Sequence, residues 1–220
     1  MRTQLTFTAL CLLVACDAPA ATDAGASPDA HFAVTPRADG DRSPASAACD
    51  VVDPGRCLLP WPSNTFTVRD EGTATGLRLA VGAESLNPRD DASSLAHADG
   101  FSRVSPLLAL FERPLDEATL EAGVHLHLAQ HDHPDRGAEV PLRIEVLTIA
   151  SGETLVLADP RQVLEANADY VVVITDALRA ADGEPLEAPA GTRAALGLTP
   201  PRSAEEAATA GYHAPTRRLL

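Results

Sequence analysis

The stretch Glu153–Pro189 reads ETLVLADPRQVLEANADYVVVITDALRAADGEPLEAP and decides the fold class. Two β-prone runs, Thr154–Leu157 and Tyr170–Thr175, are separated by an Asp-Pro break and by the turn-prone residues Asn167–Asp169. The second run is the strongest strand signal in the chain, and Asp182-Gly183 after it is typical of a hairpin turn. The stretch therefore predicts a strand, a bend, a second strand and a turn.

Shorter segments on the N-terminal side continue the β pattern. Leu107–Phe111 is an apolar run, and Val124–Leu128 alternates apolar residues with histidines, which places the two kinds of side chain on opposite faces of a strand. Apolar residues also alternate along Glu139–Leu147. Short alternating strands separated by turns are typical of β-sandwiches, so we expect a mainly β fold with a sandwich over residues 106–189.

The spacing of a leucine and a tyrosine makes this prediction more specific. Leu164 lies upstream of Tyr170, which begins the strong strand, as in the tyrosine corner of immunoglobulin-like (Ig-like) and fibronectin-like sandwiches. The stretch resembles the bacterial Ig-like domains named after the S-layer protein SbsA. Such domains end in a strand, a turn and a closing strand, which are matched here by Leu178-Arg179, Gly183 and Pro185-Leu186. The resemblance implies an Ig-like sandwich with Tyr170 and Leu164 in a structural role, and it implies no particular chemistry.

The N-terminus is typical of a bacterial lipoprotein. Arg2 precedes the apolar run Leu5–Val14, which is too short to span a bilayer, and Leu13-Val14-Ala15-Cys16 resembles a lipobox. The resemblance implies a signal peptide over residues 1–15, cleavage before Cys16, and palmitate-type acylation of that cysteine, which anchors the chain to a membrane. An ordinary secretory signal cut after Ala18-Pro19-Ala20 is the alternative.

Residues 16–48 are predicted to be a disordered linker after the lipidated cysteine. They are rich in Ala, Asp, Pro, Ser, Thr and Gly, a composition that buries too little apolar surface to offset the entropy of ordering. We expect this tether to hold the folded part in the bacterial cell envelope, as an outer-membrane or periplasm-facing lipoprotein.

Cys49 and Cys57 are expected to form a disulfide. The turn-prone Asp53-Pro54-Gly55 lies between them, and the predicted compartment is oxidising. If Cys11 leaves with the signal peptide and Cys16 is lipidated, these two are the remaining thiols. A redox or metal role is disfavoured, since the spacing is not CxxC.

Residues 49–105 are predicted to be a disulfide-stapled, extended segment that packs on the sandwich through Trp61 and Phe66. The sequences CLLPWPSNTFT, TGLRLAV and DGFS resemble a segment near the N-terminus of secreted proteins of the bacterial virulence factor lipase type. There it precedes an Ig-like domain and sometimes an α/β-hydrolase domain. The resemblance implies a packing segment without a catalytic residue.

Residues 190–220 are predicted to form a helical tail. Ser203-Ala204-Glu205-Glu206 is a capping box, so a helix should begin there and end at Gly211. Pro215 suits the first turn of a second helix, whose leucines stand at the end of the sequence. We expect this tail to be truncated, with the native chain continuing past Leu220.

One histidine cluster could ligate a metal. His125 and His127 share one face of the predicted strand, and the loop after it carries His131 and His133. Imidazoles gathered in this way bind zinc, nickel or copper. The alternative is that the first pair faces solvent and the second pair decorates a hairpin loop, which we favour.

Composition and motifs narrow the function classes. The net charge is -14 and all 17 basic residues are arginines, which argues against non-specific nucleic-acid binding. The motifs GxSxG, HExxH, GxGxxG and the phosphate-binding P-loop are absent from the sequence, so we expect neither an enzyme nor a cofactor.

Three functions remain after these exclusions. The first is a lipid-anchored extracytoplasmic surface protein with a non-catalytic Ig-like module, acting as spacer, scaffold or adhesion unit on protein or polysaccharide partners. The second is the accessory N-terminal region of a secreted lipase or esterase whose catalytic domain lies beyond Leu220. The third is a lipoprotein that binds metal through the histidine cluster.

Overall fold

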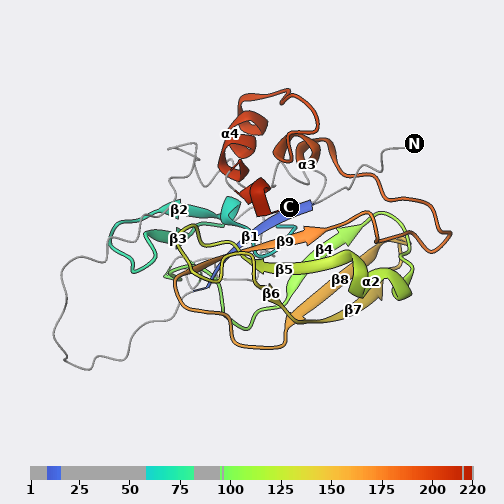
Figure 1. Cartoon of the computed structure of the whole chain (residues 1–220), viewed down its shortest axis with the longest axis horizontal. Helices are drawn as coiled ribbons and strands as arrows, with labels where there is room; N and C mark the ends of the chain where they lie inside the picture. The colour runs from blue at the N-terminus through green and yellow to red at the C-terminus, as the bar shows by residue number, and fades with distance from the viewer. Residues whose placement is uncertain (1–8, 16–57, 82–94, 96, 215, 220) are drawn as a thin grey trace.

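A computed structural model describes residues 9–15, 58–81, 95, 97–214 and 216–219, and within them the chain is mainly β with antiparallel sheets (Figure 1). The strands are β1 (Ala9–Ala15), β2 (Thr67–Arg69), β3 (Leu77–Leu79), β4 (Leu107–Phe111), β5 (Val124–Leu128), β6 (Glu139–Val140), β7 (Leu142–Thr148), β8 (Thr154–Pro160) and β9 (Ala168–Ile174). The α-helices are α2 (Leu120–Gly123), α3 (Ala190–Ala195) and α4 (Ala204–His213), and the 3-10 helices are η2 (Asn64–Phe66), η4 (Glu117–Thr119) and η5 (Thr216–Leu219).

Two sheets form the body of the molecule. One has the strand order β1-β9-β5-β6 and the other has the order β4-β8-β7, with every neighbouring pair antiparallel. The register places Leu126 of β5 opposite Val172 of β9, and Ala109 of β4 opposite Val156 of β8. The strong strand signal in the sequence is therefore an inner strand, paired on both edges.

The core lies between these sheets. Leu126 is fully buried and Tyr170 is 2% exposed on the inner face of the first sheet. Leu107 and Val156 belong to the same apolar cluster and come from the second sheet. The expected alternation is confirmed in β5, where Val124, Leu126 and Leu128 are buried and the two histidines between them are half-buried. The two sheets therefore form a sandwich-like body with one shared core.

The strand expected over residues 139–147 is divided in the structure. β6 ends at Val140, and β7 begins at Leu142 in the other sheet. Pro141 lies at the break, and because it has no N–H it cannot continue a hydrogen-bonded ladder. The alternating pattern predicted the strands correctly but did not show that the chain passes from one sheet to the other here.

The closing strand implied by the SbsA-type resemblance is not a strand in the structure. The turn at Asp182-Gly183 is present, with Gly183 at φ 83° and its N–H donating to Ala180 O over 2.8 Å. Beyond it, the bridge of Arg179 with Pro185 is the β pairing that this segment makes among the described residues. Pro185 again lacks the N–H that an extended ladder requires.

Residues 58–81 and 97–101 form a small unit of their own beside the sandwich. Strands β2 and β3 pair, and Trp61, Phe66 and Phe101 pack together, with ring centroids 5.7 Å and 5.1 Å from Trp61. Trp61 exchanges two backbone hydrogen bonds with Leu108 at the edge of β4 (2.9 and 2.6 Å). Within the segment predicted to be extended, the structure thus contains η2 and the hairpin of β2 and β3, and β3 lies in the β-prone run TGLRLAV.

The C-terminal helices cover the outer face of β9. Val171 and Val173, which point away from the sandwich core, are buried in a cluster with Ala129 and Tyr212 of α4. Arg217 joins the two helices by donating to the carbonyls of Ala195 and Ala210, each over 2.6 Å. Figure 1 shows α3 and α4 above β1 and β9. The tail is therefore a third layer.

The capping prediction for α4 is confirmed. The Ser203 side chain accepts a hydrogen bond from Glu206 N over 3.1 Å, and the Glu206 carboxylate accepts one from Arg202 N over 2.6 Å. The helix passes the expected end at Gly211 and closes at His213. The second helix is the 3-10 turn η5, and α3 was not predicted.

The segment Ala9–Ala15, predicted to be part of a signal peptide, forms strand β1 at the edge of the first sheet. It pairs with β9 over seven residues, from Ala9 opposite Ile174 to Ala15 opposite Ala168. Across the part of the chain that the structure describes, no helix has the length and apolar character needed to cross a bilayer.

Candidate functional site

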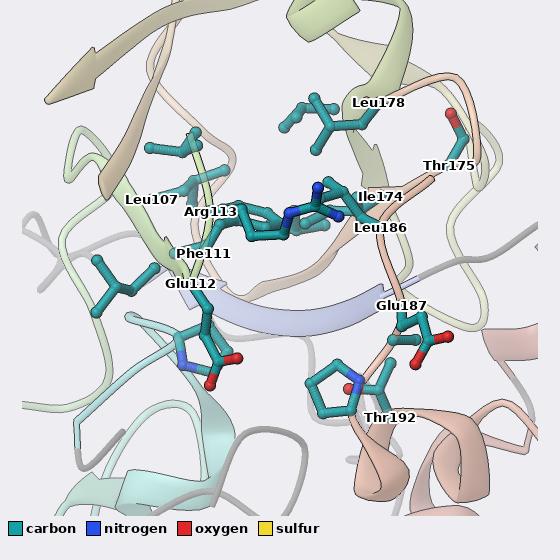
Figure 2. Close-up of a pocket in the computed structure, with 18 of the residues that line it drawn as sticks. Leu107, Phe111, Glu112, Arg113, Ile174, Thr175, Leu178, Leu186, Glu187 and Thr192 are labelled. Carbon is teal, nitrogen blue, oxygen red and sulfur yellow. The ribbon is translucent and has the colours of Figure 1, made fainter. Parts of the chain in front are cut away.

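An apolar groove of about 800 Å³ lies between the two sheets (Figure 2). One wall is β4, all five of whose residues line it. The facing wall is formed by Val124, Val172 and Ile174 of the first sheet together with Leu178, and Leu186 closes one side. The groove therefore has an aliphatic and aromatic lining along the whole length of an edge strand.

Chain topology explains why the groove opens on this side. The chain crosses between the sheets at Pro141, which joins their β6 and β7 edges. β4 is the edge of the second sheet on the opposite side, and beyond its bridge to Trp61 it has no further strand among the described residues. The segment from Glu184 to Thr192 passes along the opening and forms its rim, where the closing strand was expected.

The rim of the groove is mostly acidic. Glu112, Asp176, Glu184 and Glu187 line it together with one guanidinium, that of Arg113. Arg113 forms an ion pair with Asp182 of the hairpin turn, and Figure 2 shows its side chain extending from the β4 side toward Ile174 and Leu186. The remaining polar groups of the lining include the hydroxyls of Thr175 and Thr192. An apolar ligand or segment with a basic flank suits this charge distribution.

The two residues of the predicted tyrosine corner lie together at the entrance to β9. Leu164 and Tyr170 are both buried, and the Tyr170 hydroxyl accepts a hydrogen bond from Glu165 N over 2.9 Å. Burial raises the pKa of Tyr170, and the hydrogen bond from Glu165 acts in the opposite direction. Leu164 N in turn donates to Arg103 O over 3.1 Å, so this corner also holds the segment that precedes β4.

Asp169, at the start of β9, is a titratable group that the sequence reading did not single out. Its backbone is fixed, because its carbonyl accepts from Ala129 N (2.7 Å) and Gln130 N (3.2 Å). Burial raises the pKa of its carboxyl to about 6, since loss of solvent disfavours the charged form. It lies directly opposite Val14 of β1, so this strand contributes to the surroundings of Asp169.

The four candidate metal-ligating histidines have separate partners. On β5, His125 places Nδ1 2.7 Å from a Glu139 carboxylate oxygen and Nε2 3.1 Å from Ala122 O. Both ring nitrogens are thus directed at protein oxygens and not at a point shared with the other histidines. The His127 Nδ1 lies 3.1 Å from Gly137 O.

The loop histidines also have separate partners. His131 Nδ1 lies 2.7 Å from Asp132, and His133 Nε2 lies 3.0 Å from Glu165. Within the described ranges, no group of three or more His, Cys, Asp or Glu side chains has a geometry that could hold a metal ion. The predicted metal cluster is therefore not assembled in this structure.

The remaining predicted sites fall outside the described residues. They are the lipidation site Cys16 and the expected disulfide pair Cys49 and Cys57. Cys11 belongs to β1. The disulfide and the lipidation thus remain predictions from the sequence.

Sequence reasoning missed the groove. Its signal was present in the prolines of EPLEAPA (residues 184–190), which prevent this segment from pairing along the sheet edge. Apolar walls with a charged rim favour the binding of an apolar chain or segment.

None of the family models, curated proteins or solved structures compared with this amino-acid chain matches the chain.

Proposed function

We propose that this chain is a lipid-anchored extracytoplasmic surface protein whose folded part is a non-catalytic Ig-like module. The module acts as a scaffold or adhesion unit, and a signal peptide over residues 1–15 and an acylated Cys16 attach it to a membrane of the bacterial cell envelope. The surface partner is a protein or polysaccharide.

One observation carries the Ig-like part of this proposal. Tyr170 begins β9, its hydroxyl receives the Glu165 N–H over 2.9 Å, and Leu164 packs beside it in the core that two antiparallel sheets share. This is the arrangement by which sandwiches of this class fix the corner between their sheets. The groove along β4 adds a surface on which such a module can bind a partner.

The anchoring part is carried by the sequence Leu13-Val14-Ala15-Cys16. Each buried methylene of an acyl chain contributes about 0.8 kcal/mol, so several chains on one cysteine hold a protein firmly at a membrane. The acidic composition, with a net charge of -14, suits a soluble module outside the cell.

The test is the intact mass of the native protein extracted with detergent. We expect an N-terminus at Cys16 that carries the acyl groups. A mass near the 23.0 kDa of the chain, less residues 1–15 and plus the acyl groups, would favour the small surface lipoprotein. A Cys16→Ser variant should retain residues 1–15 and take up no labelled fatty acid. A much larger native mass would instead favour the accessory region of a longer hydrolase, and an unacylated mature chain would refute the anchor.

A further inference from the structure

Strand β9 has the composition of an inner strand. Its inner face carries Tyr170 and Val172 in the sandwich core, and its outer face carries Val171 and Val173 beneath the C-terminal helices, all four buried. Strands covered on both faces are continuous apolar runs, whereas edge strands are usually short, charged or interrupted by proline. Apart from Asp169 near its start, β9 is a continuous apolar run without proline, so its backbone edges are protected by pairing.

β1 supplies that pairing on one side. It covers the full length of β9 with seven antiparallel residue pairs, and β5 covers the other edge. In an antiparallel pair, about half of a strand's N–H and C=O groups point to each neighbour. Removal of β1 therefore leaves a row of β9 backbone groups without partners, between two buried faces.

The proposed function requires this removal, because cleavage before Cys16 takes the whole of Ala9–Ala15 away. We infer that the vacated position beside β9 is a binding site for an extended, apolar segment of a partner polypeptide, which adds as a strand antiparallel to β9. This inference rests on the proposed cleavage and goes beyond it by naming the kind of partner and where it binds.

The surroundings of β1 favour a single strand as the occupant. β1 contacts both α3 and η2, and Figure 1 shows α3 above it. The position that β1 occupies beside β9, α3 and η2 is called the slot below. An isolated strand of a partner can take the same position beside β9 as β1 does. A second copy that pairs β9 with β9 is the alternative occupant, and its binding would depend on protein concentration.

The chemistry of the partner follows from the slot. The strand seated there, ALCLLVA, is uncharged. Residues Ala190 and Thr192 of α3 also line the groove with its acidic rim, so the slot and the groove are neighbouring sites on one side of the molecule. An apolar strand of about seven residues could occupy the slot, and a basic flank on it would complement the acidic rim of the groove.

The test uses native protein whose mass shows that residues 1–15 are absent. The probe is a labelled peptide of residues 9–15 with Cys11→Ser and an added arginine at each end. The control peptide also carries Leu12→Pro, which removes an N–H and breaks the ladder at similar hydropathy. The control protein is the Cys16→Ala precursor, in which β1 remains attached and occupies the slot.

We expect the probe to bind the mature protein saturably, and the proline peptide to bind it at least about tenfold more weakly. The probe should also bind the precursor at least about tenfold more weakly than it binds the mature protein. Hydrogen exchange should show the amides of residues 168–174 protected by the probe in the mature protein and already protected in the precursor.

No binding, equal binding of both peptides, or equal binding to both proteins would overturn the inference. So would concentration-dependent dimerisation that protects the same amides without peptide. A native mass that includes residues 1–15 would refute the proposed cleavage and this inference together, whereas a cleaved chain that binds no peptide refutes this inference alone.

Discussion

Replacement of Tyr170 by phenylalanine tests the corner at the entrance to β9. The substitution removes the hydroxyl that accepts from Glu165 N over 2.9 Å and keeps the ring, which is 2% exposed. Core packing is thereby preserved, and the change in stability reports on one hydrogen bond.

The magnitude follows from the burial of the two groups. A typical hydrogen bond contributes about 0.5–1.5 kcal/mol net, and a donor left fully buried without a partner costs about 1–3 kcal/mol. The side chain of Glu165 is exposed, so water can reach part of its neighbourhood, and the hydrogen bond is only partly buried. We expect Tyr170→Phe to lower the free energy of unfolding by about 1–2 kcal/mol, which corresponds to a fall in Tm of about 2–8 °C.

The assay is urea unfolding followed by two signals. The single tryptophan, Trp61, reports on the segment bonded to β4, and circular dichroism reports on the sheets. Coincident transitions would support two-state unfolding and the use of a single free energy. Val163→Ala is the matched control, since Val163 is 58% exposed beside this corner and should cost less than about 0.5 kcal/mol. A Tyr170→Phe effect no larger than this control would refute the reasoning.

Three further perturbations follow from the structure. Gly123→Ala should destabilise by about 1–3 kcal/mol, because a Cβ there would lie 2.5 Å from Leu178 Cβ and 2.7 Å from its backbone; thermal unfolding that matches wild type would contradict this. In the chain that retains β1, Asp169→Asn should raise stability at pH 7 by up to about 3 kcal/mol and leave it unchanged near pH 4. The reason is that the pKa of Asp169 in the folded protein, about 6, lies above its ordinary value of 3.8. The stability that the neutral carboxyl contributes is therefore complete below pH 4 and is lost as the pH rises through 6. Equal dependence of stability on pH in the wild type and the variant would refute this prediction. Replacing both histidines of β5 by alanine should leave zinc affinity unchanged in a calorimetric titration. The reason is that their ring nitrogens lie against separate protein oxygens, and no group of three or more ligands is assembled among the described residues. A tenfold loss of affinity would restore the metal hypothesis.

Alternation and turn chemistry are local properties, and they predicted most of the strands. β5 shows this most clearly, because its two faces differ in burial as the pattern VHLHL requires. The Ser203 cap of α4 is another case, since a hydroxyl three residues before a glutamate can satisfy the helix N-terminus without tertiary contacts. Local sequence therefore determined element type in these places.

Pairing between distant segments could not be predicted in this way. The pattern over residues 139–147 does not say that Pro141 marks a change of sheet, because that depends on which strands are available as neighbours. The four histidines are close in sequence, yet the fold places a different acceptor beside each of them, including Glu165 from a distant segment beside His133. The groove arises only where two sheet edges and the 184–192 segment meet.

By itself, the sequence determined the mainly β class, the alternation of the strands, the hairpin turn at Asp182-Gly183 and the start of α4, because backbone preference and solvent exposure act over a few residues. Only the tertiary structure decided that β9 lies between β1 and β5, that helices cover its outer face, and that an apolar groove opens along β4. These features depend on burial and hydrogen bonding between segments far apart in the chain, and the energy of such contacts is set by the neighbours that folding brings together.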